Sequence, residues 1–370
     1  MPTIDDVARQ AGVSTATVSR VINQHPRVAA ATRRRVRQAM EALGYEPNNL
    51  ARNLRARSLR VFGLIVPDIL ASFFTAIARG VEDVAYAHGF SVMLSNSDGD
   101  PFKEAEYLRT LRTERVAGII LGPTEKANAE ARSVLRAGIP LVTIDRRIAE
   151  LELDAVTTDS DAGIAAAVEH LHGHGHRAIG YIGGPLDVST GRRREEAFFA
   201  ALRRLGLATS SEWVAQADFR EDGGQQAALE MLTATNRPTA LFVANEMMTL
   251  GALRAVREVG LSMPKDLAVI GFDDTPWARL LDPPLTVVAQ PAYDIGRLAA
   301  EALLRRIDDP ARRVSTSLLA PQFLVRASCG EHLDNGASAT DLARADAVLA
   351  LPSTMPALAP SRPRGHARGV

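Results

Sequence analysis

Five side chains near the start of the chain are of types that contact nucleic acid. Thr15, Ala16, Thr17, Ser19 and Arg20 share the polar side of one short segment. Hydroxyl and guanidinium groups donate hydrogen bonds to phosphate oxygens and to base edges. This chemistry requires a rigid element that presents the side chains together, so the neighbouring sequence must supply one.

The neighbouring sequence predicts two short helices joined by a tight turn. In segment 4–11, apolar residues recur at the i, i+3, i+4, i+7 spacing of one buried helix face. Gly12 ends this helix, Val13 fills the turn, and Ser14 is a suitable N-cap for a second helix that buries Val18. Such a pair is the helix–turn–helix unit, whose second helix enters a major groove of DNA. A helical hairpin without DNA contacts is the alternative.

The distribution of charge favours the DNA-binding interpretation. Residues 1–60 contain eleven Arg, no Lys and four acidic residues, a net charge of +7, and residues 61–370 carry −7. A surface that is only solvated would mix both signs. Charge segregated in this way is typical of a phosphate-binding head on a body that does not bind nucleic acid.

Two further elements complete the head. A third helix is predicted over Thr32–Leu43, and its start is weak because Ala29 and Ala30 stand where a capping Ser or Thr is expected. Pro47–Arg55 predicts a basic helix that is too short to be stable alone, so we expect it to fold against a partner chain or DNA. Its Leu54 either wedges into a minor groove or packs against the body.

From Val61 onward, nearly continuous apolar strands alternate with amphipathic helices. This alternation is typical of parallel sheets covered on both faces. The strands are too many for one sheet, so we predict a small all-α head and an α/β body of two doubly wound parallel-sheet lobes. Residues 331–370 lose this periodicity and are expected to be disordered. The helices predicted in the body cover 73–88, 103–113, 161–172, 192–205, 224–235 and 247–259.

Composition restricts the class of protein further. Apolar residues make up 46% and charged residues 23%, as in ordinary globular proteins. The single Cys329 excludes a disulfide framework and fits a reducing compartment. The sequence shows neither a signal peptide nor an apolar run of membrane-spanning length, so we expect a cytoplasmic protein associated with the nucleoid.

Two other classes compete with a DNA-binding protein. An enzyme with a doubly wound fold is disfavoured, because the sequence lacks GxSxG, a P-loop and a GxGxxG after its first strand. The four histidines of segment 170–176 suggest a metal, but their i+2 spacing scatters the imidazoles, so neither metal nor cofactor is expected. A periplasmic-type sugar-binding protein would need a signal peptide and would not need the basic head.

A series of motifs resembles the lactose-repressor (LacI/GalR) family of bacterial transcription regulators. They occur in the family's order and spacing, and the resemblance covers about residues 2–330. The motifs are TIDDVARQAGVSTATVSRVIN, YEPNNLARNLR, GLIVPDI, EHLHGHGHRAIGYIGG, RPTALFVANEMMTLGALRAVRE, LAVIGFDD and DPPLTVVAQP. The resemblance implies a repressor whose binding to operator DNA is controlled allosterically by a small molecule.

The resemblance also implies roles for individual residues of the head. Thr15, Ala16 and Arg20 would read base edges, with Arg20 donating to guanine O6 and N7. Hinge helices pair across the family's homodimer, and the residue matching Leu54 inserts at the operator's central step. The operator would be pseudo-palindromic, since it mirrors the two-fold symmetry of the protein. The expected DNA contacts are Ser14, Thr15, Ala16, Thr17, Ser19, Arg20, Asn23, Asn49, Arg52, Leu54 and Arg55.

The body resembles the family's periplasmic-binding-protein-like effector module, whose lobes close on a small molecule at the carboxyl ends of the strands. A sugar is the expected ligand, because carboxylates accept from hydroxyls, Arg donates, and an aromatic face covers the ring. Two of the candidate residues have an alternative role: Phe73 would belong to the core, and Arg194 would form an ion pair within one lobe. Asp159 is expected to support a crossover between the lobes rather than to contact the ligand. The expected effector contacts are Asp68, Phe73, Phe74, Asp145, Arg146, Thr190, Arg194, Phe219, Asn245 and Asp273.

These expectations divide the chain into four parts. They are a helix–turn–helix head (1–46), a hinge helix with its linker (47–60), an effector-binding and dimerisation body (61–330) and the tail (331–370). The first lobe would hold about 61–160 and 291–318, and the second about 161–290 and 319–330. The chain would therefore cross between lobes near 159–162, 289–292 and 318–321.

Three positions depart from the family pattern. The family usually has Asp after an Ala-Asn pair, and this chain has Glu246 after Ala244 and Asn245. Ser160 stands where Asn usually follows TTD, and Ala197 stands where Gly is common before Phe198. Glu246 and Ser160 lie where they would change hydrogen bonds of the hinge or pocket. The ligand class therefore does not follow from any single relative.

Overall fold

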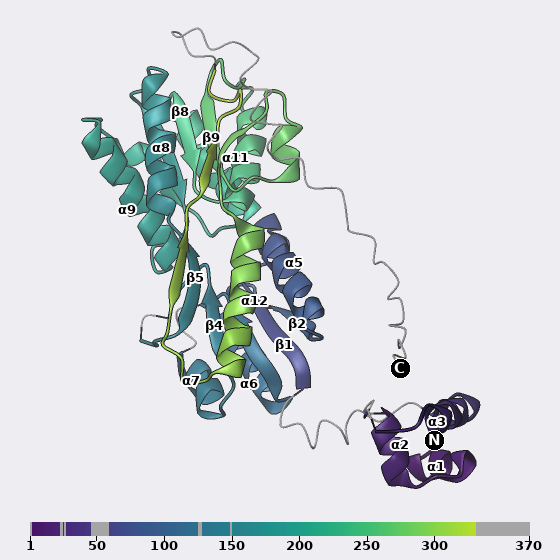
Figure 1. The fold of residues 1–370 in the computed structure, drawn as a ribbon. Helices are drawn as coiled ribbons and strands as arrows, with labels where there is room; N and C mark the ends of the chain where they lie inside the picture. The colour runs from purple at the N-terminus through teal and green to yellow at the C-terminus, as the bar shows by residue number, and fades with distance from the viewer. Residues whose placement is uncertain are drawn as a thin grey trace, which may run out of the picture.

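The structure is a computed structural model that describes residues 2–22, 25, 27–45, 59–124, 128–148 and 150–330 (Figure 1). The predicted helix Pro47–Arg55 and the predicted tail 331–370 lie outside the described residues. The expected DNA contacts outside them are Asn23, Asn49, Arg52, Leu54 and Arg55. Among the described residues, no helix has the length and apolar content that a membrane crossing requires.

The head contains three helices around one small apolar cluster. They are α1 (Ile4–Ala11), α2 (Thr15–Ile22) and α3 (Ala30–Leu43). Val7, Val18 and Val36 are fully buried, one from each helix, which explains why three short amphipathic segments fold together. The predicted helix–turn–helix pair is present, and Gly12 supplies the left-handed conformation at the end of α1, with a φ of 60°.

The first lobe is built on a six-stranded parallel sheet. Its order is β11–β5–β4–β3–β1–β2, and every pair is parallel. The strands are β1 (Leu59–Val66), β2 (Ser91–Asn96), β3 (Val116–Leu121), β4 (Leu141–Ile144), β5 (Asp154–Thr158) and β11 (Thr316–Leu319). The helices of this lobe are α5 (Ser72–Ala87), α6 (Pro101–Thr113), α7 (Asn128–Arg136) and α12 (Ala292–Asp308).

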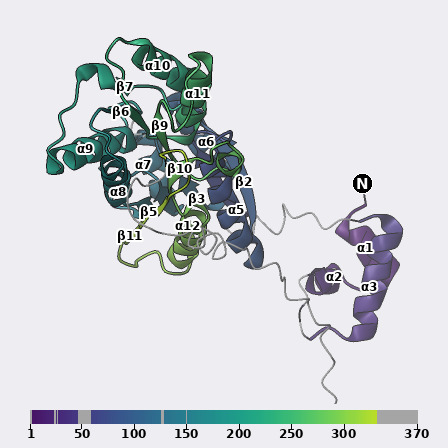
Figure 2. The ribbon, with the colours of Figure 1, turned by 90° about the horizontal axis from the view of Figure 1, so that it is seen from above.

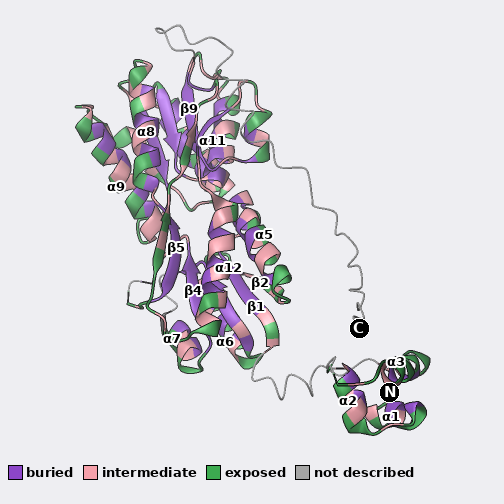
Figure 3. Ribbon diagram, viewed as in Figure 1, coloured by how far each residue is buried: buried purple, intermediate pink, exposed green. Residues whose placement is uncertain are grey.

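Helices cover both faces of the central part of this sheet, so strands β1, β3, β4 and β5 are mostly buried (Figure 3). Leu64 of β1 packs with α5 and α12 on one face, whereas its neighbour Ile65 packs with α6 and α7 on the other. The helices α5 and α12 approach very closely, because a side chain at Gly80 or Gly296 would collide with the backbone of the facing helix. This tight pair fixes the position of α5 beside the sheet.

The second lobe repeats the same plan. Its sheet has the order β12–β10–β9–β8–β6–β7, with only the β10–β12 pair antiparallel among its described strands. The strands are β6 (Ile179–Gly183), β7 (Val214–Gln216), β8 (Ala240–Val243), β9 (Ala268–Phe272), β10 (Thr286–Ala289) and β12 (Gln322–Leu324). The helices α8 (Ser160–Gly173) and α9 (Ser189–Arg204) cover one face, and α10 (Glu221–Thr233) and α11 (Glu246–Glu258) cover the other (Figure 2).

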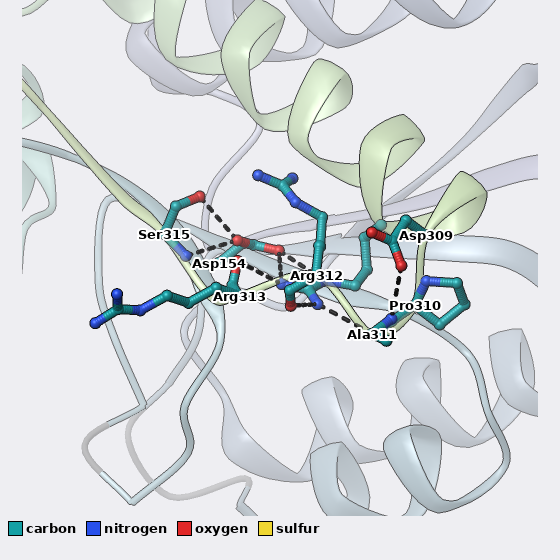
Figure 4. Close-up of polar contacts among 8 residues, drawn as sticks. Asp154, Asp309, Pro310, Ala311, Arg312, Arg313 and Ser315 are labelled. Atoms are coloured by element: carbon teal, nitrogen blue, oxygen red, sulfur yellow. Dashed lines mark hydrogen bonds and ion pairs between the residues drawn. The ribbon is translucent and has the colours of Figure 1, made fainter.

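The chain passes between the two sheets after β5, after β10 and after β11. The side chain of Arg306, at the end of α12, helps to hold β11 in the first sheet. The Arg306 guanidinium donates to Asp154 Oδ2 at 2.8 and 2.9 Å. Asp154 Oδ1 accepts from the amide and hydroxyl of Ser315 (Figure 4). Asp154 is 2% exposed, so this ion pair holds β11 beside β5 from within the lobe.

The predicted fold class is confirmed, with differences in the extent of the elements. Most predicted helices begin one to three residues earlier than expected, as α9 does at Ser189. Strand β7 is short, because Trp213 before it belongs to a 3₁₀ turn (Ser211–Trp213) and β7 ends at Gln216. The helices α7 and α12 were not predicted. The third helix begins at Ala30 rather than Thr32.

The weak start of α3 yields a test of the head's stability. Ala29 occupies the N-cap and forms no side-chain capping bond. We expect Ala29→Ser to stabilise the head by about 1 kcal/mol, because a Ser hydroxyl would accept from a free amide of the first turn. Amide hydrogen exchange of α3 in the full chain measures this change. The control is Ala30→Ser, inside the helix, where Ser lowers helix propensity; an equal gain there would contradict the capping explanation.

Candidate functional site

The exposed face of α2 presents the side chains predicted to contact DNA. Thr15, Ala16 and Arg20 are exposed, and Thr17 and Ser19 are half-buried. Arg20 is exposed and forms no ion pair within the described part of the chain. The first turn of α2 carries no acidic residue, which leaves its positive N-terminal end open to a phosphate.

Ser14 caps the N-terminus of α2. Its Oγ accepts from the amide of Thr17 at 3.3 Å and lies 3.0 Å from the Thr17 hydroxyl. The predicted N-cap is therefore confirmed. In addition, Thr3 and Asp6 form a capping box at the start of α1, for which the TxxD spacing was a signal. Both caps hold short helices that would otherwise fray.

The body contains a cavity of about 280 Å³ between the two lobes, at the carboxyl ends of their strands. The order β2–β1–β3–β4–β5, repeated as β7–β6–β8–β9–β10, is the doubly wound order in which ligands bind at this edge. The structure brings all of the predicted effector residues together here. The cavity is lined by Pro67, Asp68, Ala71, Phe73, Phe74, Asp98, Gly99, Asp145, Arg146, Pro185, Val188, Thr190, Arg194, Asp218, Phe219, Arg220, Asn245, Asp273 and Gln290.

Four of the non-glycine residues that line the cavity adopt a backbone conformation that is uncommon for residues with a side chain. Asp98, Asp145, Phe219 and Asp273 follow β2, β4, β7 and β9, with φ values of 55°, 62°, 64° and 73°. Such a conformation costs about 1–3 kcal/mol and persists only where the surrounding structure enforces it. The coincidence of all four in one cavity indicates that the strand ends are shaped for a ligand.

Phe219 provides the aromatic face that the sequence predicts. Its ring lies against the backbone of Gly184, where an added Cβ would come within 2.0 Å of the ring. From the other lobe, the guanidinium carbon of Arg146 lies 5.7 Å from the ring centroid. Phe73 and Phe74 pack edge to face at 4.9 Å; both belong to the core cluster and also line the cavity, so the two interpretations of Phe73 apply together.

Arg194 is a buried donor at the wall of the cavity. It is 5% exposed, donates from Nη1 to the carbonyl of Ala244 at 2.8 Å, and stacks over Phe272 at 4.1 Å. No carboxylate within ion-pair distance of it is found in the described residues, so the alternative of an ion pair within one lobe finds no support there. Its Nε has no hydrogen-bond partner among them. A buried donor at the wall of a cavity is placed to donate to an oxygen atom inside that cavity.

Asp273 carries the strongest electrostatic perturbation of the cavity. Burial and the nearby charge of Glu246 raise the pKa of its carboxyl to about 7, although Arg194 opposes this shift. Its Oδ1 accepts from Gln290 Nε2 at 2.8 Å. The group therefore changes charge near neutral pH, and its other oxygen remains available to a ligand.

Sequence reasoning missed several of the residues that line the cavity. Asp98, Asp218 and Gln290 follow β2, β7 and β10, so the strand-end rule applied to every strand would have found them. Asp159 does not line the cavity and pairs with Arg193 at 3.6 Å. The histidines of segment 170–176 belong to no group of three or more metal-ligating residues in the described ranges.

Comparison with known proteins gives the family. The model of the bacterial regulatory proteins of the lacI family matches residues 3–48, and that of the periplasmic binding protein-like domain matches residues 168–329. The chain is 34% identical over 330 residues to the HTH-type transcriptional repressor PurR of Aliivibrio salmonicida, covering 89% of this chain and 99% of the relative.

Two solved structures extend the comparison. The lac repressor dimer bound to operator and the anti-inducer ONPF is 29% identical, with a TM-score of 0.78, covering 89% of this chain and 99% of that one. A LacI family transcriptional regulator from Enterococcus faecium with bound ribose is 30% identical, with a TM-score of 0.66, covering 74% and 100%. The chain belongs to the lacI family and is a DNA-binding transcriptional repressor with an effector-binding body, not an enzyme.

The raised pKa of Asp273 predicts how stability depends on pH. The folded chain keeps a proton on Asp273 that the unfolded chain releases near its ordinary pKa of 3.8, so this contribution is lost as the pH rises through about 7. Asn at position 273 cannot ionise and tolerates the positive φ. The free energy of unfolding of Asp273→Asn, relative to the parent, should rise by about 2 kcal/mol between pH 5 and pH 8.

Urea unfolding across this pH range measures the difference. Asp145→Asn is the matched control for losing a cavity carboxyl at a positive φ. Parallel stability curves for the parent and Asp273→Asn would contradict the electrostatic account of Asp273.

Proposed function

We propose that this repressor works as a homodimer that binds a pseudo-palindromic operator and responds to an uncharged sugar or a closely related polyol. The cavity chemistry carries the proposal: buried Arg194 and Asp273 lie with the exposed face of Phe219 at one wall. Vicinal hydroxyls satisfy donors and acceptors together, and the apolar side of a sugar ring covers an aromatic face.

The size and charge of the cavity support this ligand class. A volume of about 280 Å³ lies just below the roughly 300–1,000 Å³ of sites for drug-sized ligands, which suits a monosaccharide. The lining holds five Asp and three Arg residues. This excess of carboxylates disfavours an anionic ligand such as a sugar phosphate.

The first lobe offers a surface for a second copy of the chain. β2 is an edge strand of the sheet, and its Met93 and Leu94 are 41% and 47% exposed. Tyr86 of the adjacent α5 is 79% exposed. An edge strand with exposed apolar side chains is a template for association. A dimer through this face would place two heads on the two half-sites of an operator.

The proposed mechanism of control uses the three chain crossings. Residues 1–46 would read DNA, residues 47–60 would form the hinge, and the lobes of residues 61–330 would rearrange when the effector binds. Rearrangement alters the spacing of the paired hinges and hence operator affinity. A repressor of this kind acts on chromosomal DNA, so we place it in the cytoplasm.

The DNA-reading role of Arg20 gives one test. If Arg20 donates to a guanine, Arg20→Ala should relax base preference at one position of each half-site, at a cost of about 1–3 kcal/mol. Binding-site selection with the full chain measures the preference. Arg9→Ala, an exposed Arg paired with Asp6 on α1, is the control and should leave the preference unchanged. A selected site with the same base preference in Arg20→Ala would refute base reading by this residue.

A thermal-shift screen with the full chain tests the ligand class. Ribose and other neutral monosaccharides are compared with ribose 5-phosphate and with a free nucleobase. A true effector at a hundredfold excess over its Kd should add about 2.7 kcal/mol to stability. The shift should vanish in Phe219→Ala, which removes the aromatic wall. A shift produced by the base or the phosphate but by no neutral sugar would overturn the assignment.

A further inference from the structure

The N-terminus of α5 lacks a cap from its own lobe. Its N-cap residue is Ala71, which has no side-chain acceptor. The carbonyl of Ala71 accepts from the amides of Phe74 and Thr75, at 3.1 and 3.3 Å. The amides of Ser72 and Phe73 therefore need acceptors from elsewhere, because buried backbone donors are rarely left unpaired.

The other lobe supplies these acceptors. The carboxylate of Glu246, the first residue of α11, accepts from the amide of Ser72, from the Ser72 hydroxyl at 2.7 Å and from the amide of Phe73 at 3.2 Å. Glu246 thus caps a helix that lies 174 residues away in the sequence and in the opposite lobe. Met247 follows it and packs against the core cluster of the first lobe.

Two helices share this one carboxylate. Glu246 lies in the first turn of α11, whose own N-cap Asn245 accepts from the amide of Met248 at 3.0 Å. The positive ends of α5 and α11 therefore both face the Glu246 side chain, which favours its charge although it is only 3% exposed. Burial nevertheless raises its pKa, and the neighbouring charge of Asp68 adds to this shift.

The contact lies at the wall of the effector cavity. Phe73, whose amide Glu246 holds, lines the cavity from the first lobe, and Asn245 lines it from the second. By comparison, the interlobe hydrogen bond from Arg220 to the carbonyl of Asp98 is exposed and 3.4 Å long. The buried contact of Glu246 is therefore the stronger of these two connections across the cleft.

We propose that Glu246 is an interlobe latch: by capping α5 from α11, it holds the cleft closed and positions the Phe73 wall of the cavity. When the cleft opens, α5 loses this cap and its first turn frays. The extent of fraying therefore indicates whether the lobes are open or closed. The latch concerns the chain's own closure and holds whether or not the effector is a sugar.

Hydrogen–deuterium exchange of the ligand-free full chain tests the latch. Glu246→Ala should speed exchange of the Ser72 and Phe73 amides about tenfold, the effect of losing a charge-assisted hydrogen bond. Small-angle scattering should show a larger radius of gyration for the same variant. Glu104→Gln is the matched control, because Glu104 is a fully buried carboxyl that accepts from the Thr124 amide within the first lobe. It should change exchange at Thr124 and leave both latch readouts unchanged.

Two further variants distinguish loss of the latch from general misfolding. Glu246→Gln keeps the shape and one acceptor, so it should show the same changes with smaller amplitude. Ser72→Ala removes the hydroxyl donor, and its destabilisation should disappear when Glu246 is already Ala, as expected for coupled residues. Unchanged exchange at Ser72 and Phe73 in Glu246→Ala, or equal opening in Glu104→Gln, would overturn the proposal.

Discussion

The carboxyl ends of two parallel sheets meet at one cleft, and this places charged groups where apolar packing cannot neutralise them. Asp273, Glu246 and Arg194 are all at most 7% exposed. An isolated buried charge is costly, so each must find a partner or shift its pKa. Glu246 uses two helix N-termini, Arg194 uses a carbonyl and an aromatic face, and Asp273 holds a proton until about pH 7.

The same strand ends carry backbone strain that the rest of the body must offset. A Phe at a positive φ is unfavourable, and the absence of a side chain at Gly184 allows the ring of Phe219 to settle on the backbone. The apolar cores on both sides of each sheet hold these turns in place. The strained turns at the cavity therefore lower the stability of the fold, and the packed apolar layers offset this loss, as is common at binding sites.

The sequence predicted what depends on local pattern. Apolar periodicity located the three helices of the head, and strand-end reasoning with the family resemblance named residues that the structure gathers around one cavity. Contacts between distant segments could not be predicted in this way. The Glu246–Ser72 contact needs both lobes in place. The assignment of 291–318, which contains α12, to the first lobe came from the family resemblance and not from the local pattern. Periodicity carries no information about such pairings.

The free energy of the Glu246 contact is of the size expected for a conformational switch rather than for a permanent structural interaction. A regulatory equilibrium between closed and open lobes must lie within a few kcal/mol of balance, or an effector could not shift it. Hydrogen bonds to a charged group contribute about 1.5–3 kcal/mol each, and burial of the carboxylate cancels part of that gain. A charged side chain that is only partly compensated, placed between Phe73 and Asn245, is therefore where ligand contacts would most easily change the arrangement of the lobes.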